Sequence, residues 1–258
     1  MSLAKWTTLI AAGSALGMGA SAEGWYASGS IGINSQSDSS NSGITGAFTT
    51  GDIGDGTTID VAAGTDYGWN TEFDNGLALS GEVGKAMFGG WRFAGEIAYT
   101  SADVDTHNGV TLGGGSIDAL DAAAIAGSPT ALGVTIGDVV ADGQGEIESL
   151  SVFANVYYDF NTEGAFQPYL GAGIGFSDVD VTYRPSDIGV IDDGETKFAY
   201  QLKAGAAFEI NETTAVFGEY AYRATDDIET ENDLFPGTLD IENQQNIFSV
   251  GVRFKFGA

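Results

Sequence analysis

The residues of this sequence that could do chemistry are charged side chains set at every second position of otherwise apolar segments. Because side chains on a strand point alternately to opposite faces, these charges share one face and large apolar residues share the other. Five acids and five bases fall on the polar face: Glu82, Arg92, Glu96, Asp159, Lys203, Glu209, Glu219, Arg223, Arg253 and Lys255. Opposite charges in equal number predict a network of ion pairs inside an enclosed lumen.

Two functions of such a lumen remain open. The pairs could simply fill and neutralise it, or they could line a narrow gated path for solutes or ions. Inward glycines at Gly171, Gly173 and Gly175 would leave local room for water and favour the second function. We expect Glu82, Glu96, Lys203, Glu219 and Arg253 at the centre of the network, and Arg92, Asp159, Glu209 and Lys255 nearer one end.

The last strand carries the pattern most clearly, over 246–256. Its apolar residues occupy alternate positions: Phe248, Val250, Val252, Phe254 and Phe256. The residues between them are Ser249, Gly251, Arg253 and Lys255. A ribbon with one aromatic face and one charged face is typical of a strand that meets lipid on one side and a wet lumen on the other. Arg253 and Lys255 should find acidic partners across the lumen, Glu219 first.

Seven further segments alternate in the same way, at 25–33, 76–87, 91–100, 146–160, 166–177, 197–210 and 214–223. Most have about 9–12 residues, near the length that a tilted strand needs to cross hydrocarbon. The connections are alternately long (34–75, 101–145, 178–196, 224–245) and short. This rhythm predicts an all-β fold, an eight-stranded antiparallel up-and-down transmembrane β-barrel with short periplasmic turns and long extracellular loops. Its last strand must pair with 25–33, and a short helix is expected at 116–126.

The first 22 residues have the features of a cleaved secretory signal peptide. Lys5 precedes the mostly apolar stretch 6–18, and Ala20-Ser21-Ala22 is a small-residue cleavage site. We therefore expect 1–22 to be removed and 23–258 to form the barrel domain. The sequence has no cysteine, which excludes disulfides, thiolate metal sites and a cysteine nucleophile.

The formal net charge of −27 makes nucleic acid an unsuitable partner, since nucleic-acid binding needs clustered Lys and Arg. The strand charges nearly cancel, so the excess acid lies in the loops: Asp187, Asp192, Asp193, Glu195, Asp226, Asp227, Glu229, Glu231 and Asp233. A solvated anionic outer surface is the expected result. The alternative is a divalent cation that bridges these loops to anionic lipid headgroups. No cofactor or protein metal site is predicted.

Catalysis has one candidate residue. His107 is the only histidine and stands between Thr106 and Asn108 in a segment predicted as loop. A histidine beside Ser or Asp could act as base in a barrel hydrolase. Neither G-x-S-x-G nor H-E-x-x-H occurs. A surface histidine without catalytic function is the simpler interpretation.

Several strands resemble those of a known superfamily. These are 24–29 (G-W-Y-A-S-G), 154–160 (A-N-V-Y-Y-D-F), 168–175 (P-Y-L-G-A-G-I-G) and the closing 248–256. They are similar to strands of the outer-membrane β-barrel superfamily, within it most to opacity-protein, surface-antigen and OmpA-like small barrels of Gram-negative bacteria. The resemblance implies an eight-stranded barrel inserted by the barrel-assembly machinery, which reads an aromatic last strand. Here Gly257 and Ala258 follow Phe256, a departure from members that end on the aromatic residue.

Together these features predict an outer-membrane protein with a structural or surface-interaction role, acidic extracellular loops and no enzymatic activity. A narrow porin is the alternative, and a barrel hydrolase is a remote one. The expected partners are outer-membrane lipids, lipopolysaccharide and the barrel-assembly machinery.

Overall fold

The structure is a computed structural model that describes residues 24–162, 164–187 and 189–256. The predicted signal peptide lies outside the described residues. Eight long strands form the body of the molecule: β1 (Trp25–Gln36), β6 (Asn75–Ala86), β7 (Trp91–Leu112), β9 (Gly145–Asp159), β10 (Phe166–Tyr183), β11 (Ile191–Asn211), β12 (Thr214–Thr225) and β15 (Gln244–Phe256).

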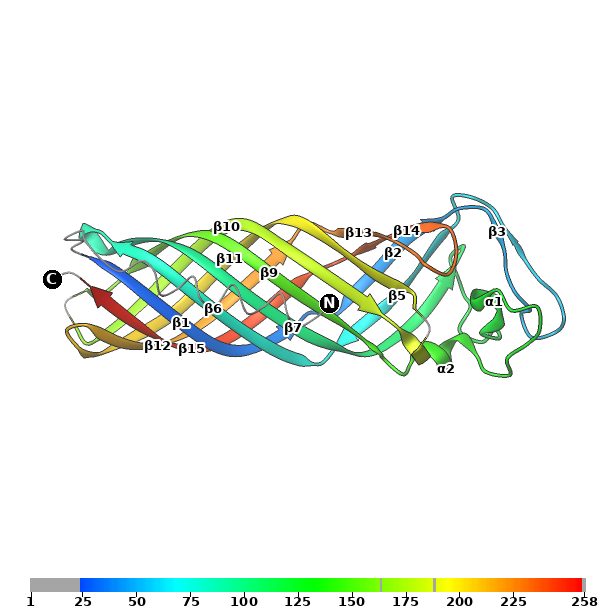
Figure 1. Ribbon diagram of the computed structural model, residues 1–258, viewed down its shortest axis with the longest axis horizontal. Helices are drawn as coiled ribbons and strands as arrows, with labels where there is room; N and C mark the ends of the chain where they lie inside the picture. Colours follow the sequence, from blue (N-terminus) through cyan, green and yellow to red (C-terminus); the bar gives the residue numbers. More distant parts are fainter. Residues whose placement is uncertain (1–23, 163, 188, 257–258) are drawn as a thin grey trace, which may run out of the picture.

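These strands form an antiparallel ring in the order β7-β6-β1-β15-β12-β11-β10-β9, and β9 pairs back onto β7 (Figure 1). The first and last strands pair over their whole length, from Trp25 opposite Phe256 to Gln36 opposite Gln245. The predicted eight-stranded up-and-down barrel is confirmed. Among the described residues, no helix is long and apolar enough to cross a membrane.

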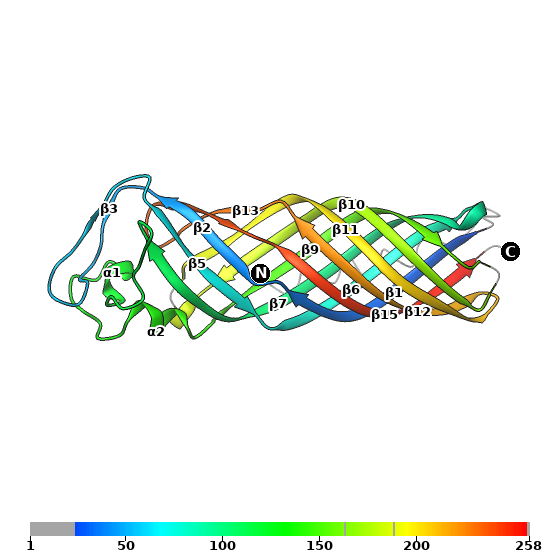
Figure 2. The ribbon, with the colours of Figure 1, turned by 180° about the vertical axis from the view of Figure 1, so that it is seen from behind.

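All three short connections lie at the end where β1 begins and β15 ends, which we call the turn end (Figure 2). One of them is the 3-10 turn Phe88–Gly90 between β6 and β7. Its Gly89 and Gly90 have φ of 75° and 85°, a region that L side chains rarely adopt. The glycines therefore permit the sharp reversal between two paired strands.

The long connections contain more strand than the short pieces that the sequence indicates at Ile59–Ala62 and Tyr67–Phe73. They contain β2 (Ser39–Thr45), β5 (Asp66–Phe73), β13 (Ile228–Glu231) and β14 (Gly237–Ile241), which pair in the order β13-β14-β2-β5-β7. The hairpin β3 (Phe48–Thr49)–β4 (Asp60–Val61), β8 (Gly115–Ser116), α1 (Ala123–Ala126), α2 (Ile136–Val140) and the 3-10 turn Pro185–Asp187 complete this loop end. Of the helix expected at 116–126, only α1 forms.

The two faces of the ring exchange character along three adjacent long strands, β7, β9 and β10. On β10 the outward residues are large and apolar from Phe166 to Phe176, and Phe176 is 61% exposed. The next outward residues are Asp178 and Asp180. The inward face changes in the opposite sense, from Ser177 to the fully buried Val179. Within two residues, the apolar side chains of β10 change from the outward face to the inward face.

The same exchange occurs at this level on β9 and β7, the next two strands of the ring. Outward Ile97 of β7 gives way to outward Asp103, while inward Glu96 gives way to inward Val104. Above this level the inward residues form an upper core of buried side chains: Tyr67, Ala102, Val104, Ile147, Val179, Val181, Tyr183, Ile191, Ile228, Leu239 and Ile241. The loop end therefore folds as a water-soluble sheet protein does, around its own apolar core.

This exchange explains why the strands extend past the predicted boundaries. The outward apolar band below Asp178 is the lipid-facing belt, and it includes all five alternating apolar residues of β15. Beyond the belt the strands keep pairing because burial of their apolar side chains in the upper core stabilises them. The boundary between Phe176 and Asp178 accordingly marks the outer edge of the hydrocarbon.

An arginine scan of β10 tests the position of this boundary. Leu170→Arg, at mid-belt, should reduce the free energy of unfolding in lipid vesicles by about 2–4 kcal/mol, because a cation would face hydrocarbon. Asp180→Arg should leave it unchanged or slightly higher. The pKa of Asp180 is raised by partial burial and by Asp178 and Glu148, so this position already suffers repulsion between acids. Equal losses in urea titrations of both variants would contradict the boundary.

Candidate functional site

The lumen inside the belt holds a network of charged and aromatic side chains, beginning near the turn end with Arg92. Its Nε donates to both carboxylate oxygens of Asp159, at 2.8 and 3.1 Å. Its Nη1 donates to the hydroxyl of Tyr26 at 3.0 Å. The guanidinium also lies 4.4 Å from the ring centre of Tyr157, within cation–π range. Arg92 is thus held on three sides while only 2% exposed.

Glu82 lies next along the lumen and is satisfied by neutral donors. The hydroxyl of Tyr26 donates to its Oε1 at 2.8 Å, and the hydroxyl of Tyr157 donates to its Oε2. Asn155 donates to the same Oε2 at 3.3 Å. Tyr26 therefore links Glu82 to Arg92, so a carboxylate and a guanidinium share one aromatic bridge.

Glu96 is the centre of the network. Its Oε2 lies 2.8 Å from Lys203 Nζ, and its Oε1 lies 3.6 Å from Arg223 Nη2. The amides of Asn155 and Gln201 donate to Oε2 at 2.6 and 2.8 Å. Oε2 thus has three donors, whereas Oε1 has no hydrogen bond and only the longer ion pair with Arg223. These partners compensate a buried carboxylate that would otherwise be strongly unfavourable.

Lys203 extends the network to a second acid. Its Nζ lies 3.0 Å from Glu219 Oε1, and the hydroxyl of Tyr169 donates to Glu219 Oε2 at 3.0 Å. Lys255 pairs with Glu209 at the rim of the turn end, where Gln167 also donates to Glu209 at 3.0 Å. Lys203 therefore joins two acids in the lumen, and Lys255 joins one at its rim.

Arg253 does not have the partner that the sequence suggested. None of the ion pairs among the described residues includes Arg253, and Glu219 is bound to Lys203 instead. The Arg253 guanidinium lies over aromatic rings, 5.2 Å from the centre of Tyr26 and 5.5 Å from Tyr169. Parity along a strand gives the face of a residue but not its level in the barrel, so it could not select this partner.

The inward glycines also differ from expectation, since they leave no free space. A Cβ at Gly171 would stand 2.4 Å from the ring of Tyr157, and one at Gly173 would stand 1.9 Å from Asn155 Oδ1. The glycines make room for large side chains of neighbouring strands. Tyr157 and Tyr169 are network residues that sequence reasoning missed, although both share the inward parity of Asp159.

His107 is not in a surface loop, contrary to expectation. It lies on the extended part of β7 and is 2% exposed. Its Nδ1 lies 2.8 Å from Thr71 Oγ1 on β5. Among the described residues, no group of three or more acidic or histidine side chains could hold a metal ion.

Comparison with known proteins agrees with this fold. The family model of the outer membrane protein beta-barrel domain matches residues 7–256. The chain belongs to this family. The ring of eight strands is thus that of an outer-membrane barrel.

Individual relatives are distant. Outer membrane protein PagN of Salmonella typhimurium is 23% identical over 137 residues, which cover 46% of this chain and 57% of PagN. The match thus spans little more than half the length of that curated relative. Neisserial surface protein A is 14% identical with a TM-score of 0.42, covering 90% of this chain and 97% of that one. Ail of Yersinia pestis, solved with a heparin analogue, is 17% identical with a TM-score of 0.33, covering 90% and 99%.

The central position of Glu96 can be tested by removing its charge. Glu96→Gln should lower the free energy of unfolding by about 3–5 kcal/mol, because it leaves buried Arg223 without a carboxylate partner and buried Lys203 with Glu219 alone. Urea unfolding in lipid vesicles measures the change.

Asp192→Asn is the matched control, since Asp192 forms an exposed ion pair with Arg184 at 2.6 Å. An exposed pair contributes about 0–1 kcal/mol, so this variant should unfold almost as the parent does. If both acid-to-amide changes had the same small effect, the network around Glu96 would not stabilise the barrel.

Proposed function

We propose that this protein is a non-conducting, non-enzymatic outer-membrane barrel that acts through its extracellular end, in a structural or surface-interaction role. The observation that carries the proposal is the continuous filling of the barrel interior. Paired charges and aromatic rings occupy the lumen inside the belt, and the apolar upper core follows directly above them. A path for ions would have to cross both layers.

The outward residues just above the belt support the prediction of an anionic outer surface. Acids stand there on three adjacent strands: Asp103, Glu146, Glu148, Asp178 and Asp180. The pKa of Glu146 is raised by partial burial and by the nearby Glu148 and Asp103. This anionic collar would lie at the level of the lipid headgroups.

Outer-membrane lipids and lipopolysaccharide are the partners that we propose for this level. A divalent cation between the acidic residues and anionic headgroups stays a prediction. Export through a signal peptide at 1–22 and insertion by the barrel-assembly machinery through Phe248–Phe256 also belong to the proposal.

A narrow porin is the second candidate, and one observation favours it. A cavity of about 20 Å³ remains in the lumen beside Ser30, Glu96 and Lys203. A polar space of this size can hold a water molecule. Two or more such waters in a line would be the start of a conducting path.

Conductance across planar bilayers separates the two candidates. The refolded parent should give no single-channel steps, because the network and the upper core both obstruct the path. The double variant Glu96→Ala/Lys203→Ala removes a paired anion and cation together and should still give none, since the upper core remains. Reproducible steps in the parent, with ion selectivity altered in the double variant, would establish the porin instead.

A hydrolase with His107 as general base is the remaining candidate. Burial lowers the pKa of His107 to about 4, with a smaller opposing effect of Asp142. A base with so low a pKa accepts a proton poorly at neutral pH. His107→Ala should accordingly abolish no activity on lipid or peptide substrates. Loss of a hydrolytic activity that the parent displays would contradict the non-enzymatic proposal.

A further inference from the structure

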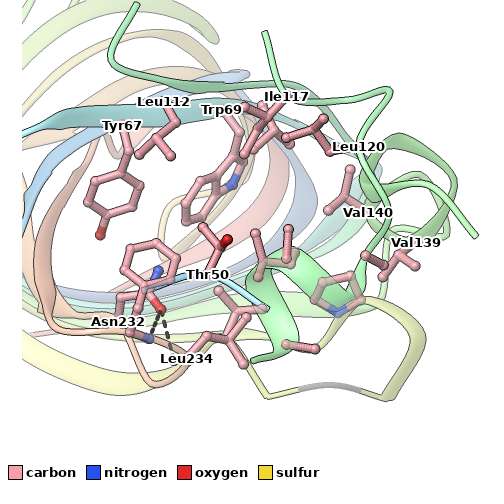
Figure 3. Close-up of a pocket in the computed structure, with 18 of the residues that line it drawn as sticks. Thr50, Tyr67, Trp69, Leu112, Ile117, Leu120, Val139, Val140, Asn232 and Leu234 are labelled. Carbon is pink, nitrogen blue, oxygen red and sulfur yellow. Dashed lines mark hydrogen bonds between the residues drawn. The ribbon is translucent and has the colours of Figure 1, made fainter. Parts of the chain in front are cut away.

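A cavity of about 90 Å³ lies at the extracellular end, bounded by β5, β7, α1, α2 and the turn before β14 (Figure 3). Its volume is several times that needed for one water molecule. Figure 3 shows side chains of all these segments around one space, among them Trp69, Leu120, Val140 and Leu234. The wall is almost wholly apolar, which favours a small organic molecule over a cluster of waters.

Aromatic rings close one side of this cavity. Phe48 of β3 stacks on Phe235 with ring centres 4.9 Å apart and planes inclined by 7°. Tyr67 meets Phe235 edge-on at 5.1 Å. The cavity is therefore built from segments far apart in sequence, and each of them supplies large apolar surface.

Some polar atoms on the wall are engaged by the protein, whereas the hydroxyls of Tyr67 and Tyr183 have no hydrogen-bond partner among the described residues. The hydroxyl of Thr50 accepts from the backbone N–H of Ile59 at 2.9 Å and donates to the carbonyl of Gly51 at 2.8 Å. Asn232 Oδ1 accepts from the backbone N–H of Leu234 at 2.9 Å. These groups shape the wall and are not free to hold a ligand.

His107 on the same wall has a ring nitrogen that is not engaged. Asn41 Nδ2 donates to Thr71 Oγ1 at 2.7 Å, and Thr71 Oγ1 lies 2.8 Å from His107 Nδ1. When the Thr71 hydroxyl donates its proton to Nδ1, the ring proton stands on Nε2. This buried N–H has no acceptor among the described residues.

The surroundings of His107 keep its ring neutral and fixed. Trp69 and Tyr183 meet it edge-on, with ring centres 6.4 and 4.8 Å away. Burial, opposed in part by Asp142, lowers the pKa of His107 to about 4, so the ring carries no charge at neutral pH. A charged ligand would find no counter-charge on this wall and would lose its hydration.

We propose that this cavity is a binding site for a neutral, mostly apolar molecule of monocyclic size whose single hydrogen-bond acceptor meets His107 Nε2–H. The apolar wall provides the affinity and the imidazole N–H selects for the acceptor. This site goes beyond the proposed surface role and does not depend on whether the lumen conducts.

The test uses two probes of nearly equal shape, acetophenone and α-methylstyrene, which differ in a carbonyl oxygen against a methylene group. Binding is followed by ¹⁵N NMR of histidine-labelled protein in lipid nanodiscs, where the single histidine gives one imidazole signal pair. The free protein should show the Nε2–H tautomer. Acetophenone should shift the Nε2 signal and bind about five-fold more tightly than α-methylstyrene, after correction for lipid partitioning.

Three variants locate the effect. Ala124→Trp, on the cavity wall at 3% exposure, should abolish saturable binding of acetophenone, whereas Val134→Trp, at an exposed position, should not. His107→Phe keeps the ring and removes the N–H, so both probes should bind it equally. The affinities of the two probes for His107→Phe are measured by saturation-transfer NMR on the ligands. If Ala124→Trp does not refold, these affinities test the proposal without it.

Four results would overturn the proposal. They are equal affinity of both probes for the parent, an unchanged affinity ratio in His107→Phe, saturable binding retained in a refolded Ala124→Trp, and an Nδ1–H tautomer in the free protein.

Discussion

The structure depends on one constraint, the period of two that a β-strand imposes on its side chains. A strand that passes from hydrocarbon into water without a break must change which face is apolar, and its sequence alone must make the change. β10 does so while paired with β11 in unbroken register, from Phe166 opposite Phe208 to Tyr183 opposite Ile191. No bulge reverses the faces. The exchange from Phe176-Ser177 to Asp178-Val179 performs the whole transition.

Two kinds of interior follow from this exchange. Inside the belt, the apolar residues face lipid, so the lumen must be filled by polar groups that satisfy one another, as around Glu96. Above the belt, the apolar residues turn inward and the interior becomes an ordinary hydrophobic core. The charged network of the lumen specifies which side chains pair, but burying its charges costs free energy. The apolar upper core stabilises the protein without needing specific partners. The cavity beside His107 belongs to this second kind of interior.

The sequence predicts the belt well because the contrast there is large, between Phe or Leu outside and Glu, Lys or Gly inside. It predicts the loop end poorly for two reasons. The segment 178–183 (D-V-D-V-T-Y) does alternate, but in the opposite phase and beside Gly- and Asp-rich stretches that are typical of loops. The pairing of β2 with β5 depends on contacts remote in sequence, which no local pattern contains. The sequence does not predict the ion-pair partners in the lumen for a similar reason. Arg253 and Glu219 share the inward face but lie at different levels of the barrel.

The exchange of faces can be measured directly because the chain has no cysteine of its own. Single cysteines placed at each position 170–182 of β10 would carry a spin label, and collision rates with oxygen and with a water-soluble nickel complex would be compared in lipid vesicles. We predict high oxygen collision rates at outward 170, 172, 174 and 176, high nickel rates at outward 178, 180 and 182, and low values of both at inward 179 and 181. High oxygen rates that continue through 178–182 would place that segment in lipid and contradict the account.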